Sequence, residues 1–501
     1  MNSTDLVRLQ KIDERIREIA EEEGLLTTDV TFEVGSSHRM IEAMAYNFPT
    51  NYSHWSFGRD FERHRTIYEH FGAGIPYEVV WNFEKPRAFL VETNPFALNV
   101  TILAHVYGHV DFFLGSNYLK RGRVFTDIAE EAYYAAERFA DYERKYGKEV
   151  ESVITAAMTI QWHQDPDPFA DELDEEDLRK RLVDQEQARL LKKQREDEFK
   201  KAPSLTEIEE IEKNLRRLET HTPPEPTYDL LWYIIQRSPK PLKPWAKDVL
   251  KVIRNQARHL AVQRRTKILN EGWATYWHTR IMRRLWEERL ITKEEHGVFN
   301  TFNSNVVKKS ETRINPYALG LALYEYVKEA WDKGRFGPAY EACEDPYLKA
   351  RWDTGAGKGT EKIFQIRSSF SDRMAVETLF TPDFIRQQEL FIYERFKKNP
   401  SGPLTIIADD TPKQIRALLL GAMTHYGIAQ ISVESGNYGS QGVLYLRHHE
   451  TGFELDPAWR DRTLSYIRFL WGRNVLLEAP EEGKLKVFTV NAKGEVTSKD
   501  F

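Results

Sequence analysis

The sequence predicts an α+β fold, with a long, mainly α-helical N-terminal domain and a small C-terminal α/β domain. Two observations carry this prediction. Apolar residues recur at helical spacing through most of residues 1–398. After the stretch Asn399 to Pro403, short apolar runs alternate with helical segments in the order β-α-β-β-α-β. That order is typical of a ferredoxin-like sandwich, so we expect two domains, 1–398 and 403–501.

One hairpin is expected early in the helical domain. The apolar runs Glu78 to Trp81 and Ala88 to Val91 predict two strands joined by a short connection. Asn94-Pro95 then provides an N-cap and a first helical residue. Gly115 provides the C-terminal stop, so the predicted helix has about five turns.

A charged insertion interrupts the helical domain. Residues 171–220 are dominated by Glu, Lys, Arg and Asp, with sparse Leu and Ile at helical spacing. This pattern predicts a long, exposed helix. Further helices are expected on either side of it, over residues 127–163, 245–263 and 266–287.

Composition limits the functional classes. The 501-residue chain has a formal net charge of −6 and lacks the basic excess that a nucleic-acid binder usually carries. Its single cysteine, Cys343, excludes an intramolecular disulfide and a zinc site of several cysteines. The N-terminus lacks the apolar core of a signal peptide, and the apolar run Phe96 to Leu114 contains two His and an Asp, as a buried helix would and a membrane span would not. We therefore expect a cytoplasmic protein.

The pair His105 and His109 is the strongest chemical signal. Residues four apart lie on one face of a helix, so both imidazoles can reach a single metal ion. Glu271 and His278, seven residues apart, share a stripe on a second predicted helix. If the two stripes face each other, His105, His109 and Glu271 form the ligand set of many catalytic zinc sites. His278 would be a further ligand, a support for a ligand, or a proton-transfer group.

One position departs from the zinc-protease pattern. In His-Glu-x-x-His, the Glu after the first His is the general base, and Val106 stands there in this chain. Asp111 projects to another side of the helix, and Glu271 cannot be both a tight ligand and a free base. His278 remains as the candidate base, so ordinary peptide hydrolysis is disfavoured. Alternatively, the cluster is a buried hydrogen-bond network without a metal. A chain with 14 His residues contains two His four residues apart by chance fairly often, so the pair alone does not prove a metal site.

Three smaller features have simple interpretations. Gly108, in a helix interior, suggests that a substrate or another helix approaches the backbone closely. The segment Gly355 to Thr360 resembles a phosphate-binding loop, but Trp352 replaces a required Gly and no apolar strand precedes it. The adjacent His448 and His449 point to opposite faces of a predicted strand, so they should not share a metal.

Four segments resemble the SpoVR family, named for stage V sporulation protein R. They keep the family's order along the chain: Ser53–Gly58, Ala104–Phe113, Asn270–His278 and Ile314–Gly320. The resemblance runs over most of the chain. Outside the predicted metal site, we expect His54 to cap or brace Trp55 and Asn315-Pro316 to start a helix.

The resemblance implies a biological setting. It implies a role in spore cortex formation, or in stress physiology in bacteria that do not sporulate. It also implies two partners, a PrkA-like serine protein kinase and a YeaH/YhbH-type von Willebrand factor A protein. His163 lies in a segment that looks like the family's and joins the possible ligands, whereas the charged insertion matches poorly.

Two functional hypotheses follow. In the first, the N-terminal domain is metallohydrolase-like, with a divalent metal, zinc favoured, held by His105, His109 and Glu271. A metal-bound water would then attack cell-wall precursors or peptide-like amides, with His278 transferring a proton. In the second, the chain is a non-enzymatic partner in a kinase-regulated complex. There the charged helix and the C-terminal domain are docking surfaces, and the polar cluster only fixes the helices.

Overall fold

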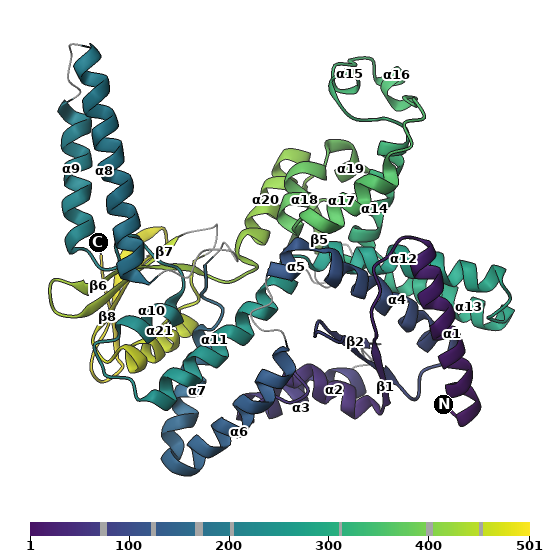
Figure 1. The fold of residues 1–501 in the computed structure, drawn as a ribbon, viewed down its shortest axis with the longest axis horizontal. Helices are drawn as coiled ribbons and strands as arrows, with labels where there is room; N and C mark the ends of the chain where they lie inside the picture. The colour runs from purple at the N-terminus through teal and green to yellow at the C-terminus, as the bar shows by residue number, and fades with distance from the viewer. Residues whose placement is uncertain are drawn as a thin grey trace. The chain divides into compact units, whose positions relative to one another are not determined.

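The computed structural model is mainly helical, with small sheets (Figure 1). It describes residues 1–70, 78–121, 127–165, 174–200, 205–309, 313–396, 404–449 and 454–500. The chain forms two compact units, each built from two stretches of sequence: Met1–Ala140 with His259–Tyr426, and Asp141–Arg258 with Gly427–Phe501. The domain boundary predicted near 398–403 was based on a change in amino-acid composition. Composition does not determine which segments of the chain pack together. As a statement about independent domains, the boundary stays a prediction.

The first unit contains the elements around the predicted metal ligands. They are α1 (Ser3–Glu22), β1 (Thr31–Gly35), α2 (Ser37–Tyr46), α3 (Trp55–His70), β2 (Glu78–Trp81), β3 (Arg87–Val91), α4 (Phe96–Gly115), α5 (Asn117–Arg121), α6 (Ile128–Tyr146, continuing into the second unit), α12 (Lys267–Glu287), α13 (Lys293–Val306), α14 (Pro316–Asp332), α15 (Pro338–Glu341), α16 (Pro346–Ala350), α17 (Gly359–Ser369), α18 (Asp372–Leu379), α19 (Pro382–Gln387), β4 (Ile392–Phe396), β5 (Leu404–Asp409) and α20 (Pro412–His425). Its core lies where α4, α12 and α14 pack together, with α1, α13 and α17 around them.

Helix α4 is buried along almost its whole length. Every residue from Ala97 to Phe113 is buried, because apolar side chains surround the helix on all sides. Among the described helices, α4 is long and apolar enough to cross a membrane, but 94% of its apolar stretch is covered by the rest of the structure. The five-turn length and the end at Gly115 are confirmed. The predicted start is wrong by one residue, because Pro95 is the N-cap, Phe96 is the first helical residue, and no side chain caps the helix.

Glycines let the three core helices approach closely. A Cβ added at Gly108 of α4 would lie 2.6 Å from the Cα of Ala274 on α12. A Cβ added at Gly272 of α12 would lie 2.3 Å from the carbonyl carbon of Gly320 on α14. The prediction that something approaches Gly108 is confirmed, and the neighbour is the backbone of α12. These contacts fix the spacing between the helices that carry the predicted ligands.

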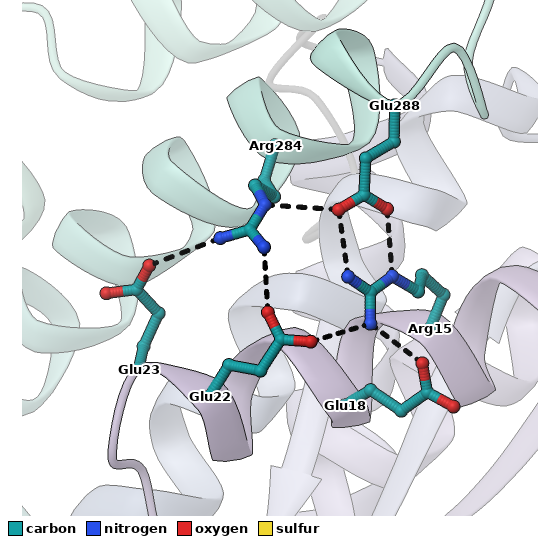
Figure 2. A network of polar contacts seen from close by, with 6 residues as sticks. All are labelled: Arg15, Glu18, Glu22, Glu23, Arg284 and Glu288. Atoms are coloured by element: carbon teal, nitrogen blue, oxygen red, sulfur yellow. Dashed lines mark hydrogen bonds and ion pairs between the residues drawn. The ribbon is translucent and has the colours of Figure 1, made fainter.

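Helix α1 is joined to the end of α12 by a charged network (Figure 2). Arg15 donates from two guanidinium nitrogens to the two carboxylate oxygens of Glu288, at 2.8 Å each. Arg284 donates to the same carboxylate at 3.1 Å and to Glu22 of α1 at 2.8 Å. Bidentate guanidinium–carboxylate pairs have a fixed geometry, so the network sets the position of α1 along α12.

The predicted hairpin is present. Strands β2 and β3 pair antiparallel, with Val79 opposite Phe89. Strand β1, which was not predicted, adds to the other edge of β3 in parallel, with Glu33 opposite Phe89. A strand brought in from a distant segment leaves no hairpin signal, because its pairing depends on the packing of the chain and not on a local turn.

The second unit contains a five-stranded sheet and a helical hairpin. Its elements are α7 (Lys148–Ile160), α8 (Glu175–Lys200), α9 (Leu205–Thr220), α10 (Leu230–Arg237), α11 (Pro244–Arg264, continuing into the first unit), β6 (Gln430–Tyr438), β7 (Val443–His449), α21 (Pro457–Trp471), β8 (Val475–Glu481), β9 (Lys484–Val490) and β10 (Val496–Asp500). The charged stretch predicted as one long helix forms two helices, α8 and α9, which lie side by side (Figure 1).

The ferredoxin-like topology expected for residues 403–501 is wrong. The strand order in the main sheet is β10-β9-β8-β7-β6, with β7 and β8 parallel across the α21 connection and the other neighbours antiparallel. Strand β5, expected to be the first strand of the sandwich, pairs instead with β4 in a separate two-stranded sheet. The apolar runs predict where strands lie, but alternation along a strand does not select its partner.

Candidate metal centre

The two histidines of α4 lie one turn apart and face the same neighbour. Their ring centroids are 4.6 Å apart, and the two rings are nearly perpendicular, at 88°. Both side chains are buried, His105 at 5% and His109 at 3% exposed. Two buried polar rings on one stripe of a mostly apolar helix need polar partners, and α12 supplies them.

Glu271, in the first turns of α12, completes the predicted group. Its Oε2 atom lies 3.6 Å from Nε2 of His105 and 3.5 Å from Nε2 of His109. One donor atom from each of the three residues lies within 4.8 Å of the others. Ligand atoms around a tetrahedral zinc ion, each about 2.1 Å from the metal, lie about 3.4 Å from one another. The spacing therefore fits a shared metal ion with little rearrangement.

The hydrogen bond at Nδ1 of His109, the ring nitrogen away from Glu271, fixes the tautomer of this histidine. Nδ1 lies 2.9 Å from Oδ1 of Asn270, which precedes Glu271 on α12. An amide oxygen only accepts, so the Nδ1–H of His109 donates to it. In the neutral ring, the lone pair is then on Nε2, the atom that faces Glu271.

A longer chain of hydrogen bonds determines the tautomer of His105. Nε2 of His278 lies 2.9 Å from Oδ1 of Asn303 on α13, so His278 donates there and its Nδ1 accepts. That Nδ1 lies 2.8 Å from Nδ1 of His105, which therefore donates. The lone pair of neutral His105 is again on Nε2, facing Glu271. Two imidazole lone pairs and one carboxylate thus converge, which is the arrangement that binds a cation.

His278 contacts the predicted ligand His105 on the side of the ring away from Glu271. The three residues brought together as donors are His105, His109 and Glu271, and His278 contacts His105 through Nδ1. The structure therefore joins the two predicted stripes. A proton-transfer role for His278 stays a prediction.

A buried carboxylate holds the start of α12. Asp372, the first residue of α18, accepts hydrogen bonds from the backbone N–H of Ile268 at 2.9 Å and of Leu269 at 3.0 Å. Burial, with a smaller contribution from the charge of Glu271, raises the pKa of Asp372 to about 7 against the lowering effect of the backbone donors. The cap fixes the helical turn that carries Glu271.

Asp111 serves structure. Its Oδ1 accepts from the backbone N–H of Leu26 at 2.8 Å, and its Oδ2 accepts from Nε1 of Trp273 at 2.7 Å. The guanidinium of Arg367 lies 3.1 Å from the same Oδ2. Burial raises the pKa of Asp111, although Arg367 opposes this shift. A carboxylate with these partners agrees with the prediction that Asp111 is not the general base.

The remaining motif residues hold local structure. Nδ1 of His54 lies 2.8 Å from the hydroxyl of Ser56, and the His54 ring packs 5.3 Å from that of Trp55. Asn315 caps α14, accepting from the backbone N–H of Tyr317 at 3.0 Å. Both interpretations are confirmed. The ring of Tyr317 in turn stacks on His105, with centroids 5.9 Å apart.

Three other candidates are not members of the donor group. His163, in the second unit, contacts the carbonyl of Ala429 through Nδ1 at 3.1 Å, and burial lowers its pKa to about 4. His449 contacts the hydroxyl of Ser432 at 2.7 Å. The first amide of α17, at Gly359, donates to Asp332 at 2.7 Å, so a carboxylate already occupies the helix N-terminus that a phosphate would need.

Sequence reasoning missed the two asparagines that orient the histidines. Asn270 stands beside Glu271 in one of the quoted motifs, and its polar side chain next to a ligand was a usable signal. Asn303 lies 25 residues from His278 on another helix, and its position gave no signal.

The comparison with protein families agrees with these motifs. The family described as SpoVR like protein matches residues 3–428. The chain belongs to the SpoVR-like family. This confirms the resemblance, and the match contains all three donors and both asparagines. The chain is also similar to "Uncharacterized protein YcgB" of Escherichia coli (strain K12), with 26% identity over 479 residues, covering 90% of this chain and 87% of the relative. No solved structure matches.

Proposed function

We propose that this SpoVR-like protein is a metal-dependent hydrolase with zinc held by His105, His109 and Glu271. The observation that carries the proposal is the convergence of two Nε2 lone pairs on one carboxylate oxygen. Two His and one carboxylate leave a fourth position of a tetrahedral zinc for water. The metal would lower the pKa of that water and so supply the nucleophile. The likeness to metallohydrolases rests on this donor set and not on the fold.

The surrounding residues limit the reaction. Val106 stands where a zinc protease of the His-Glu-x-x-His type has its base. His278 acts on the centre through His105, since it contacts the Nδ1 edge of that ring. We therefore propose amides of cell-wall precursors or peptide-like compounds as substrates, cleaved without a protease-type Glu. We propose a cytoplasmic site of action, and the single cysteine is compatible with that reducing compartment.

The proposal is tested by hydrolysis of an amide substrate panel. Zinc-loaded protein should turn over at least one amide, and chelation should abolish the activity. The double variant His105→Ala/His109→Ala should be inactive. A matched control, His64→Ala/His296→Ala, removes two histidines of the same unit outside the donor group and should keep full activity. Turnover that survives in the first variant would contradict the proposal.

The role of His278 is separable in the same assay. If His278 transfers a proton, the His278→Ala variant keeps its zinc but loses turnover, and its pH–rate profile changes. If His278 only positions His105, zinc affinity falls and the profile of the reloaded enzyme keeps its shape. The hydrogen bond to Asn303 favours positioning, since it commits Nε2 of His278 as a donor.

The α8–α9 hairpin favours a second function, docking to a partner. The two helices are rich in charged side chains, and Leu191 is 57% exposed. We propose a PrkA-like kinase or a YeaH/YhbH-type protein as the partner. Co-purification should be lost when residues 175–220 are replaced by a short Gly-Ser linker. Retained co-purification would exclude the hairpin as the docking surface.

A further inference from the structure

A cleft of about 820 Å³ lies in the first unit, outside the donor group. The start of α14, the β4–β5 hairpin and helix α20 form its walls, together with residues 388–391. Small-molecule sites in proteins commonly have volumes of about 300–1,000 Å³. The cleft is therefore large enough for a ligand of that class.

Most of the lining is apolar. The large apolar side chains in it include Leu319, Leu390, Phe391, Ile407, Ile415 and Leu418. Two of them face solvent to an unusual degree, with Ile407 52% and Leu418 49% exposed. Covering such side chains with an alkyl chain is favourable by about 25 cal/mol for each Å² removed from water.

One wall of the cleft carries two cations. Lys309 and Arg313 both line it and both are exposed. The ammonium of Lys309 donates to the carbonyl of Gln388 at 3.3 Å, which holds it across the cleft rim. Glu389 is the acidic residue of the lining, so its cations outnumber its anions. An apolar wall with a cationic rim matches a ligand that has an alkyl chain and one negative head group.

We propose that this cleft binds an amphipathic carboxylate. The alkyl chain would lie against Ile407 and Leu418, and the carboxylate would pair with Lys309 and Arg313. This inference goes beyond the proposed hydrolase and does not depend on metal. The cleft and the metal centre share the first turn of α14, since Asn315 and Ala318 line the cleft and Tyr317 stacks on His105.

Calorimetric titration of the full chain with decanoate and with 1-decanol tests the proposal. Wild type should bind decanoate saturably, with or without zinc. Lys309→Glu/Arg313→Glu should weaken decanoate binding at least tenfold and leave decanol binding unchanged. Leu418→Glu should weaken both ligands. Lys413→Glu reverses a single cation on α20 outside the lining; it is the control for charge reversal near the cleft and should have no effect.

Several outcomes would overturn the proposal. The first is that wild type does not bind decanoate saturably. The second is that Lys413→Glu weakens decanoate binding as much as Lys309→Glu/Arg313→Glu does. The third is that Lys309→Glu/Arg313→Glu weakens the binding of decanoate and of decanol equally. If the charge-reversed protein does not fold, Lys309→Gln/Arg313→Gln replaces it with the same expectations. Decanoate binding without zinc and without hydrolase activity would support this inference while contradicting the proposed function.

Discussion

Two asparagine side chains determine which nitrogen of each histidine carries the proton. Asn270 does so directly for His109, and Asn303 does so for His105 through His278. Without these acceptors, each ring would be free to place its proton on Nε2, where it would block a metal. Residues that orient ligands in this way commonly contribute 10- to 100-fold to metal affinity.

We therefore predict that Asn270→Ala and Asn303→Ala each weaken zinc binding by roughly 10- to 100-fold. Competition with a chromophoric chelator measures this. Asn305→Ala removes an exposed asparagine from the same helix as Asn303 and should leave the affinity unchanged. Wild-type affinity in both Asn270→Ala and Asn303→Ala would show that the amides do not fix the tautomers.

A partly buried acid on α1, Asp13, gives the protein a predicted pH dependence. Burial raises the pKa of Asp13 from 3.8 to about 6, although a hydrogen bond with Tyr107 of α4 opposes the shift. The native state then binds more protons than the unfolded state between these values, so stability falls as the pH rises through this window. Above pH 6 the full cost of the buried charge is present.

Replacing Asp13 by Asn removes that cost. The difference in unfolding free energy between Asp13→Asn and wild type should grow by roughly 2 kcal/mol, in favour of the variant, from pH 4 to pH 8. One pKa unit corresponds to about 1.36 kcal/mol, and the partial exposure of Asp13 reduces the effect. Urea unfolding of the metal-free proteins at both pH values measures the difference. A difference that does not change with pH would mean that Asp13 titrates normally in the folded protein.

At the scale of elements, glycine contacts set the distance between the ligand-bearing helices. In Gly108→Ala, the new methyl group would meet the backbone of α12 at 2.6 Å from the Cα of Ala274, so the helices must separate. We predict a loss of about 1–3 kcal/mol in unfolding free energy, as for other overpacked cores, together with weaker zinc binding. Thermal unfolding and the chelator competition measure the two effects.

The control for this prediction is another helical glycine. A Cβ at Gly297 of α13 would meet nothing within 4 Å. Gly297→Ala should therefore stabilise the protein by up to about 1 kcal/mol and leave zinc binding unchanged. If Gly108→Ala behaves like Gly297→Ala, the close approach of α4 and α12 does not control the site.

At the scale of the whole molecule, helices and local turns were predicted from the sequence better than the pairing of strands and the contacts between distant segments. The hairpin of β2 and β3, the C-terminal end of α4 and the two ligand stripes depend on periodicity and turn residues, which are local in the sequence. The pairing of β4 with the next strand, β5, and the break between α8 and α9 at Pro203 both had local signals that were overlooked. The addition of β1 to β3, by contrast, depends on a contact far along the chain. For the same reason Glu271 was predicted from its spacing, whereas Asn303 was found only in the structure.

Metal content tests the central claim most directly. Elemental mass spectrometry of untagged protein, offered zinc and then freed of excess, should find about one zinc per chain. His105→Ala/His109→Ala should lose this zinc, and His64→Ala/His296→Ala should keep it. A wild-type protein that stays empty under these conditions, or a His105→Ala/His109→Ala variant that still holds one zinc, would contradict the assignment of His105, His109 and Glu271 as a metal centre.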